Sequence, residues 1–137
     1  MIVHETSVRV RYADTDQMGY VYYGKYPEYF EVGRVEMLRF IGISYREVEE
    51  KGILMPVADL EIKYHFPAYY DELLTVKTMI PELPRSSFLT TYELFNPQGQ
   101  KLVSGMVRLA FFDRERQRPV RVPAYLLELV QGKWPES

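Results

Sequence analysis

The sequence predicts an α+β fold in which an antiparallel sheet packs against one long helix. One stretch near the N-terminus has a helical period, whereas the second half of the chain is a series of short apolar segments separated by turns. Segments joined by turns of a few residues pair as antiparallel strands, because parallel strands need a longer crossover. The length of 137 residues fits one hydrophobic core, so residues 1–137 are expected to form a single domain.

The first predicted strand covers residues 7–12, "SVRVRY", where apolar or aromatic side chains alternate with two arginines. After about residue 22 the period lengthens and predicts an amphipathic helix that runs to residues 42–44. Pro27 lies in its first turn, where the missing N–H costs little. Gly33 lies on its apolar stripe, where the absent side chain permits close packing. The whole stripe comprises Tyr26, Phe30, Gly33, Met37 and Phe40.

A capping box formed by Ser44 and Glu47 predicts a short second helix, which Gly52 closes. The segments that follow are rich in β-branched and aromatic residues, as strands are. These predicted strands cover residues 57–66, 73–80, 86–95 and 101–113. The turn "NPQG" predicts a hairpin between the last two strands. A C-terminal helix begun by Pro123 is expected over residues 122–130.

The composition excludes several classes of site and partner. The chain has no cysteine, which excludes disulfides, thiolate catalysis and zinc–thiolate sites. A net charge of −2 lacks the basic excess of nucleic-acid-binding proteins, so no nucleic-acid partner is expected. No segment approaches the roughly 18 apolar residues of a membrane span, and the N-terminus lacks a signal-peptide core. A cytoplasmic protein is therefore predicted.

Metal and cofactor sites are not predicted either. His4 and His65 are far apart in the sequence, and neither has a ligand partner at helical spacing. The chain has no GxSxG nucleophile elbow. The glycines of "GYVYYG" do not have the spacing of a dinucleotide-binding motif.

Residues 12–26, "YADTDQMGYVYYGKY", join the first strand to the long helix and carry the strongest candidates for chemistry. The N-terminus of a helix presents unpaired N–H groups and a partial positive charge, which suit a carbonyl oxygen that gains negative charge. A carboxylate shortly before it, Asp14 or Asp16, could act on that carbonyl. Gly19 and Gly24 would let the backbone approach a ligand closely. Aspartates in such turns commonly only bind nearby N–H groups, and this role is predicted for Asp14.

The segment "VRYADTDQMGYVYYGKYPEYFEVGRVEMLR" resembles the signature of hot-dog-fold thioesterases, in the 4-hydroxybenzoyl-CoA thioesterase and YbgC-like acyl-CoA thioesterase family. The likeness continues in "MPVADLEIKYHFPAYYDELLTVKT" and "ELFNPQGQKLVSGMVRLAFFD" and covers most of residues 5–125. The resemblance implies an antiparallel sheet wrapped around one long central helix. It also implies a cofactor-free hydrolase that converts an acyl-CoA to a free acid and coenzyme A. Homodimers, often paired into homotetramers, with active sites at the subunit interface are expected.

The resemblance also assigns roles to individual residues. The second acid of the pair, Asp16, corresponds to the catalytic carboxylate, as a nucleophile or as a general base. Tyr23 corresponds to the position whose backbone N–H polarises the thioester carbonyl; some relatives carry a histidine there, and this chain does not. Arg85 is expected to contact a coenzyme A phosphate, and Ser86 and Ser87 the pantetheine amides.

Two other functions remain open from the sequence. One is a non-catalytic acyl-CoA-binding hot-dog module, and the other is a hot-dog hydratase or dehydratase acting on acyl thioesters. The latter would need a histidine paired with an acid, and both histidines lie outside residues 12–26. Glu31 is predicted to be structural and to pair across the helix or with a neighbouring subunit. The acyl group, and whether coenzyme A or acyl carrier protein carries it, stay open.

Overall fold

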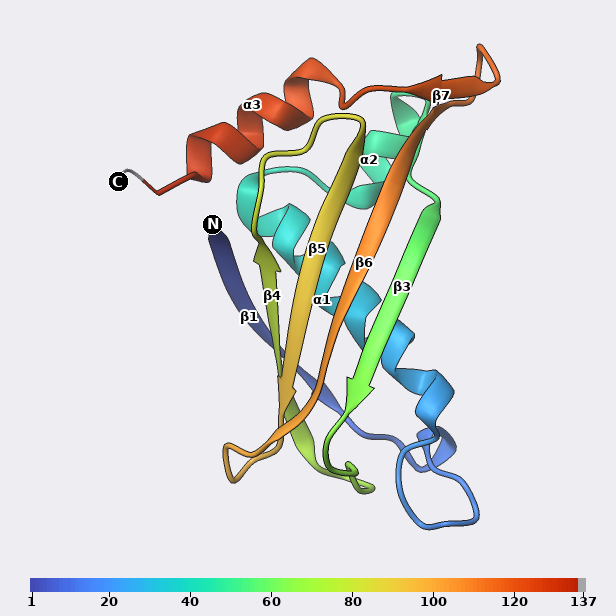
Figure 1. Ribbon diagram of the computed structural model, residues 1–137, viewed down its shortest axis with the longest axis vertical. Helices are drawn as coiled ribbons and strands as arrows, with labels where there is room; N and C mark the ends of the chain where they lie inside the picture. Colours follow the sequence, from blue (N-terminus) through green and yellow to red (C-terminus); the bar gives the residue numbers. More distant parts are fainter. Residues whose placement is uncertain (136–137) are drawn as a thin grey trace.

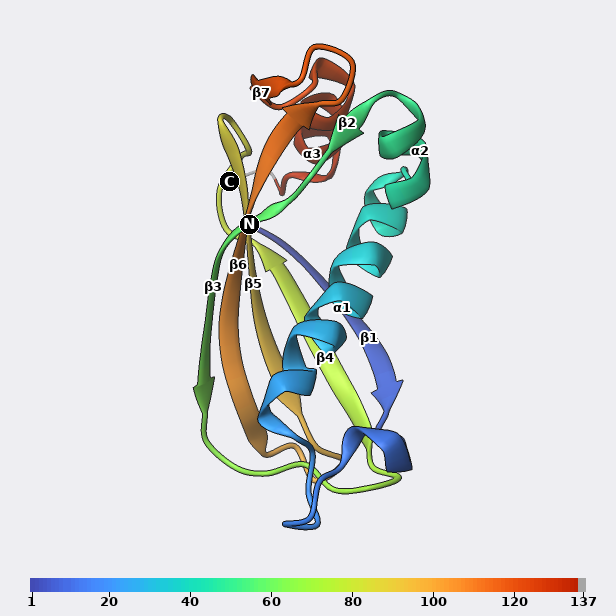
Figure 2. The same cartoon turned by 90° about the vertical axis from the view of Figure 1, so that its right-hand side faces the viewer.

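The computed structural model describes residues 1–135, in which a curled antiparallel sheet holds one long helix against its concave face (Figures 1 and 2). The main strands follow the order β1–β4–β5–β6–β3, and all neighbours are antiparallel. Their bounds are β1 Ile2–Arg9, β3 Val57–Tyr64, β4 Leu73–Ile80, β5 Ser87–Phe95 and β6 Lys101–Asp113. The predicted fold class, an antiparallel sheet around one long helix, is confirmed.

Three α-helices and two short strands complete the structure. The helices are α1 Tyr26–Ile41, α2 Tyr45–Glu50 and α3 Ala124–Lys133, and the short strands are β2 Ile53–Leu54 and β7 Arg118–Val120. Single turns of 3₁₀ helix cover Tyr12–Asp14 and Tyr23–Lys25. The second of these turns leads directly into α1. Within residues 1–135, no helix is long and apolar enough to cross a membrane.

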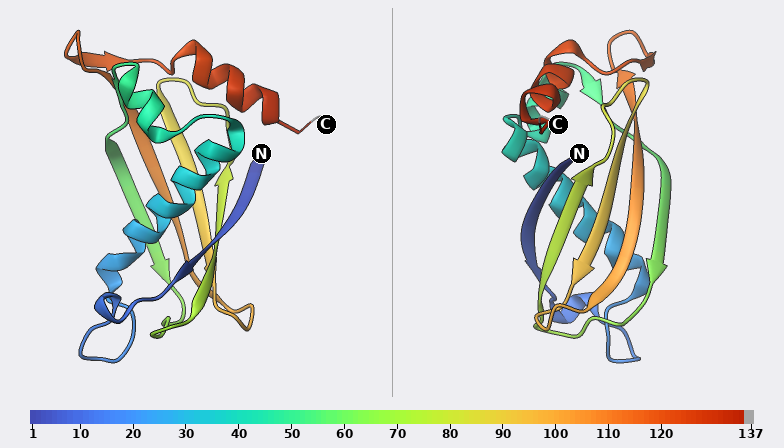
Figure 3. Two further views of the ribbon diagram at one scale, coloured as in Figure 1. Left: turned by 180° about the vertical axis from the view of Figure 1, so that it is seen from behind. Right: turned by 60° about the vertical axis from the view of Figure 1, so that its left-hand side comes forward.

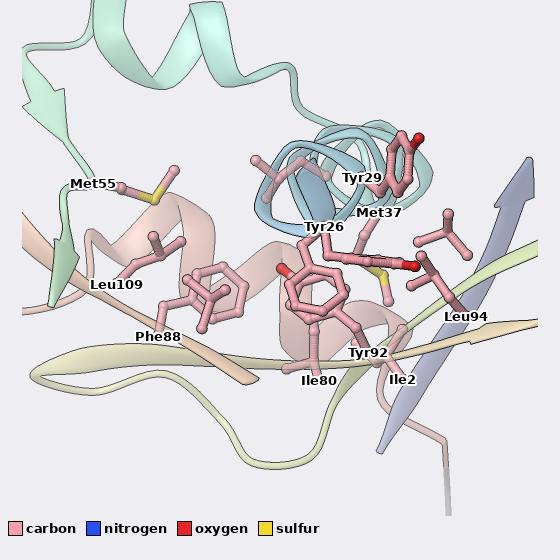
Figure 4. Packing of buried hydrophobic residues seen from close by; sticks show 14 of the residues in the cluster. Ile2, Tyr26, Tyr29, Met37, Met55, Ile80, Phe88, Tyr92, Leu94 and Leu109 are labelled. Carbon is pink, nitrogen blue, oxygen red and sulfur yellow. The ribbon is translucent and has the colours of Figure 1, made fainter. Parts of the chain in front are cut away.

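Close packing holds α1 in the curl of the sheet. A Cβ on Gly33 would lie 2.7 Å from Val76 Cγ1 on β4, so the predicted role of Gly33 in close approach is confirmed. Phe30 stacks on Tyr92 of β5 with ring centroids 4.4 Å apart, and both side chains are buried. Burial of each such ring is worth on the order of 2 kcal/mol. Figure 4 shows this layer of aromatic and aliphatic side chains between helix and sheet.

The other local predictions have mixed outcomes. The capping box is confirmed, because Ser44 Oγ accepts from Glu47 N at 3.0 Å and Glu47 Oε1 accepts from Ser44 N at 3.3 Å. The "NPQG" hairpin is also confirmed, with Asn96 Oδ1 accepting from two backbone N–H groups of the turn. Phe40 was wrongly placed on the buried stripe; it is 42% exposed and lies against His4 of β1.

The first strand is displaced from its predicted range of 7–12. It runs from Ile2 to Arg9, and Tyr12 is 78% exposed at the start of a 3₁₀ turn. The reason is that the Asp14 carboxylate accepts a hydrogen bond from Arg11 N, which turns the chain there. β2 and β7 were not predicted, because segments of two or three residues have no measurable period. The last helix begins and ends later than predicted, with Pro123 as its N-cap residue.

The two ends of the sheet carry different parts of the predicted site. The connection between β1 and α1 lies at the end where β5 finishes, whereas α3 and the start of β5 lie at the opposite end (Figures 1 and 3). The sheet also has two unlike edges. β1 contacts α1 and alternates between exposed and more buried residues, whereas β3 is exposed along most of its length and, within residues 1–135, pairs with β6 alone.

Candidate active site

Residues 15–21 form a closed loop immediately before the helical turn. Thr15 and Val21 form an antiparallel bridge at its base. Inside it, Asp16 N donates to Tyr20 O at 3.0 Å, and Gly19 N donates to Asp16 O at 3.0 Å. Gly19 has a φ of 85°, a left-handed conformation that glycine adopts without strain. The turn therefore explains why glycine occupies position 19, and the predicted contact of Gly19 with a ligand stays a prediction.

Asp14 is buried and fully engaged within the protein. Its Oδ2 accepts from Arg11 N at 3.0 Å and from the Tyr29 hydroxyl at 2.8 Å, and its Oδ1 lies 3.8 Å from Lys25 Nζ. Its backbone oxygen accepts from Tyr22 N at 2.8 Å. One residue thus joins the end of the strand to the first turns of the helix. The prediction that Asp14 holds this turn is confirmed.

Tyr29 is the partner of Asp14 that the sequence analysis did not identify. Burial, together with the hydrogen bond to the Asp14 carboxylate, raises the pKa of Tyr29 far above its usual value. The hydroxyl therefore keeps its proton and remains a donor. Tyrosines on a helix face usually signal core packing, and no local pattern distinguished this one.

Asp16 is less buried than Asp14 and only partly engaged. Its Oδ1 accepts from Met18 N at 2.8 Å in an Asx turn, which fixes the orientation of the carboxylate. Among residues 1–135, no hydrogen bond reaches its Oδ2. One carboxylate oxygen is therefore held by the loop, and the other is free to act on a ligand.

The start of the helix presents two adjacent donors. Lys25 N donates to Tyr22 O at 2.9 Å, but the N–H groups of Tyr23 and Gly24 have no hydrogen-bond partner in the described chain. Helix N-termini leave such groups unpaired, with a partial positive charge. Interaction with the Tyr23 hydroxyl raises the pKa of Tyr22, and the Asp16 carboxylate adds a smaller contribution in the same direction. Asp16 is thus within electrostatic range of the residues that begin the helix.

An aromatic cavity of about 440 Å³ adjoins this turn. It lies between the loop and the segment that leaves β3, and it is lined by Tyr20, Val21, Tyr23, Tyr26, Tyr64, His65, Phe66 and Pro67. Burial raises the pKa of Tyr26 to about 12, so this phenol is neutral at physiological pH. A mostly apolar cavity with a few polar groups is the usual form of a site for a small organic ligand.

Arg85, Ser86 and Ser87 lie far from this loop within one copy of the protein. They stand at the start of β5, whose nine residues span about 30 Å. Arg108 Nη1 donates to Ser87 Oγ at 2.8 Å, and the group lines a polar cavity of about 480 Å³. A single copy therefore does not bring the predicted phosphate and pantetheine contacts to Asp16.

Glu31 does not make the predicted pair across the helix. It is exposed, and among residues 1–135 no Lys, Arg or His nitrogen lies within 4.0 Å of its carboxylate. It lines a cavity of about 520 Å³ between α1 and α2. A pair with a neighbouring subunit remains a prediction.

Known proteins share both the sequence and the architecture. A profile described as the thioesterase-like superfamily matches residues 10–130. The acyl-CoA thioesterase YbgC of Haemophilus influenzae is 33% identical over 117 residues, which cover 85% of each chain. A DHNA-CoA thioesterase structure from Staphylococcus aureus superposes with a TM-score of 0.89 at 33% identity, covering 96% of this chain and 93% of that one.

A third similarity concerns the 4-hydroxybenzoyl-CoA thioesterase structure from Pseudomonas sp. strain CBS-3. It superposes with a TM-score of 0.81 at 27% identity and covers 93% of this chain and 98% of that one. The predicted hot-dog fold is therefore confirmed. By its sequence and its architecture, the chain belongs to the thioesterase-like superfamily.

Proposed function

We infer that the protein is an acyl-CoA thioesterase, a hydrolase that converts an acyl-CoA to a free carboxylic acid and coenzyme A. Relatives named for this activity match most of the chain, including the YbgC acyl-CoA thioester hydrolase of Escherichia coli at 29% identity. The observation that carries the mechanism is a pair of features: Asp16 lies in the loop that leads into the helix start, and within residues 1–135 neither its Oδ2 nor the N–H groups of Tyr23 and Gly24 have a hydrogen-bond partner. A carboxylate and a preorganised donor are the two groups that thioester hydrolysis needs.

The proposed reaction divides the work between these groups. The N–H of Tyr23 binds the thioester oxygen, and its hydrogen bond strengthens as that oxygen gains negative charge. Asp16 either removes a proton from the attacking water or attacks the carbonyl carbon itself, giving an anhydride that water then cleaves. In both routes the carbon–sulfur bond breaks and the thiolate of coenzyme A leaves. One such donor is typically worth about a hundredfold or more in rate.

A panel of thioesters tests the activity. Acetyl-, hexanoyl-, palmitoyl-, benzoyl- and crotonyl-CoA would each be incubated with the protein, and free thiol would be measured with a chromogenic thiol reagent. Thiol release from at least one ester is expected. A binding module would retain acyl-CoA affinity without release, and a hydratase would consume the crotonyl double bond without free thiol. Either outcome would contradict the proposal.

We also propose that the active enzyme is a homodimer, or a homotetramer built from two dimers, in the cytoplasm. The exposed edge of β3 supports association between copies, since Val57, Leu60 and Tyr64 on that strand are each at least 44% exposed. Unpaired strand edges with apolar side chains readily pair with another chain. If two β3 strands pair antiparallel, the Arg85 end of one copy lies toward the Asp16 end of the other.

Light scattering tests the assembly. A mass of two or four times 16.2 kDa is expected at micromolar concentration. In a Leu60→Lys variant each copy would place one positive charge near the paired edges. The measured mass should then shift toward that of one chain, with loss of activity. A wild-type protein that is active at the mass of one chain would contradict a site shared between copies.

A further inference from the structure

A side chain on the sheet holds the peptide that joins Tyr23 to Gly24. Tyr64, the last residue of β3, donates its hydroxyl hydrogen to Tyr23 O at 2.9 Å. Its ring also meets the rings of Tyr23 and Tyr26 edge-on, with centroids 6.5 and 5.6 Å away. Burial raises the pKa of Tyr64, so the hydroxyl keeps the proton that it donates. The first turn before α1 is thus fixed by a residue 41 positions away in the sequence.

This hydrogen bond determines where a neighbouring donor points. The C=O and N–H of a trans peptide point in opposite directions. With the Tyr23 carbonyl directed at Tyr64, the Gly24 N–H points away from β3. The preceding peptide is fixed in the same way, because Tyr22 O accepts from Lys25 N at 2.9 Å and leaves the Tyr23 N–H directed outward.

Position 24 has no room for a side chain while the Tyr22 ring stays in its present place. A Cβ on Gly24 would lie 2.6 Å from Cε2 of Tyr22, a distance that real Cβ atoms do not show. The Tyr22 ring therefore packs directly on the Gly24 backbone.

We propose that the Gly24 N–H is a second donor to the thioester oxygen, beside the Tyr23 N–H, and that Tyr64 is the positioning residue that directs it. The inference rests on the proposed thioesterase activity and extends it to two residues to which neither the sequence nor the comparisons assign this role. In this role Tyr64 need not touch the carbonyl or the attacking group. It acts by holding one peptide in a single orientation.

The first test compares Tyr64→Phe with Tyr69→Phe. Tyr69 is exposed, lies in the connection that follows β3, and its hydroxyl makes no hydrogen bond within residues 1–135. Loss of the Tyr64 hydroxyl should lower kcat about tenfold with KM changed less than about twofold, because the lost interaction strengthens only in the transition state. Tyr69→Phe should leave both values at wild type. Equal kcat in the two variants would overturn the proposal.

A spectroscopic test separates positioning from a general structural role. In an Asp16→Asn background, where turnover is slow, the C=O stretching frequency of bound benzoyl-CoA reports how strongly its oxygen is polarised. Adding Tyr64→Phe should move this frequency upward, toward that of the free ester, at unchanged affinity for coenzyme A. Adding Tyr69→Phe should not move it. An unchanged frequency in the Tyr64 variant would overturn the proposal.

A second variant decides the case if Tyr64→Phe alters assembly, since Tyr64 lies on the exposed strand. Replacing the amide N–H of Gly24 by an ester oxygen removes the proposed donor and adds no side chain. It should lower kcat at least tenfold, and wild-type kcat would overturn the second donor. The experiments distinguish a failure of the proposed thioesterase activity from a failure of the second-donor proposal. A wild-type enzyme that releases no thiol overturns the thioesterase activity, whereas active wild type with fully active variants overturns only this inference.

Discussion

The two ends of the sheet differ in what they offer a ligand. One end holds the Asp16 carboxylate, an aromatic cavity and two backbone donors that have no partner within residues 1–135. The other holds Arg85, Ser86, Ser87 and Arg108 around a polar cavity. The first end suits a reacting acyl group, and the second suits a phosphate with its polar linker. About 30 Å of β5 separates them, so the groups proposed for reaction and those proposed for anchoring lie at opposite ends of each copy.

A smaller contrast exists within the reacting end. Asp14 and Asp16 are two residues apart, yet Asp14 is buried with its carboxylate bound to Arg11, Tyr29 and Lys25. Asp16 is half-buried, and within residues 1–135 its carboxylate is bound through Oδ1 to Met18 N alone. Both make turn hydrogen bonds, so turn chemistry alone does not separate them. What separates them is the free oxygen.

The largest expected effect is on the reacting end. Asp16→Asn keeps the side-chain size and the Asx turn but removes the charge that attacks or takes a proton. It should lower kcat at least about a hundredfold, the scale of losing a general base. The melting temperature should hold or rise, because charges in active sites are often kept at some cost in stability. Steady-state kinetics and thermal unfolding of one preparation measure both.

Near-normal turnover of Asp16→Asn would contradict the assignment of the chemical step to the end of the sheet that holds Asp16. Asp14→Asn is the matched control, since it makes the same chemical change two residues away. If the Asp14 variant were the inactive one, the roles of the two aspartates would be reversed.

An intermediate effect is expected at the anchoring end. Arg85→Ala should raise KM several-fold and leave kcat nearly unchanged, the pattern of lost binding that is equal in ground and transition states. The effect should shrink with pantetheine thioesters, which lack the nucleotide and its phosphates. Initial rates over a range of both substrates measure it. Equal losses with both substrates would show that Arg85 does not contact the nucleotide.

Mixing two variants sharpens this test. If a site combines Asp16 of one copy with Arg85 of the other, a dimer of one Asp16→Asn chain and one Arg85→Ala chain contains one intact site. Co-refolded mixtures should then show a component that combines the wild-type KM with the wild-type kcat, a combination that neither variant has alone. If both residues served one site from the same chain, every site in the mixed dimer would carry one defect. Each site would then have either a low kcat or a high KM, and the combined component would not appear.

Much of the fold could be predicted from local sequence. The close approach at Gly33, the Ser44 capping box and the Asn96 turn each depend on residues within a few positions, and each is present. The role of Asp14 in the turn followed from the same local chemistry. The assignment of chemistry to Asp16 came from the family resemblance, because an isolated pair of aspartates does not rank its members.

The contacts that the sequence analysis missed are long-range. The Tyr64 hydroxyl reaches Tyr23 across 41 residues, and the Tyr29 hydroxyl reaches Asp14 across 15. Such pairs depend on how helix and sheet meet, and a tyrosine in a period-two strand looks like any other half-buried side chain. The displaced first strand has a similar cause. Its start is set by pairing of Ile2 with Ile80 on β4, which no local pattern reports.

The smallest effect on activity is expected at Asp14. Asp14→Asn retains one oxygen that can accept from Arg11 N and from the Tyr29 hydroxyl, so the turn should persist and kcat should fall less than about tenfold. Asp14→Ala removes the acceptor and leaves the buried Tyr29 hydroxyl unpaired, which should lower the free energy of unfolding by about 1–3 kcal/mol. Urea unfolding and kcat of both variants measure the two effects.

Because Tyr22 N binds the Asp14 backbone oxygen, both variants keep that contact with the start of the helix. An Asp14→Ala protein of wild-type stability would show that the buried carboxylate does not hold the turn, and the contrast with Asp16 would then rest on exposure alone.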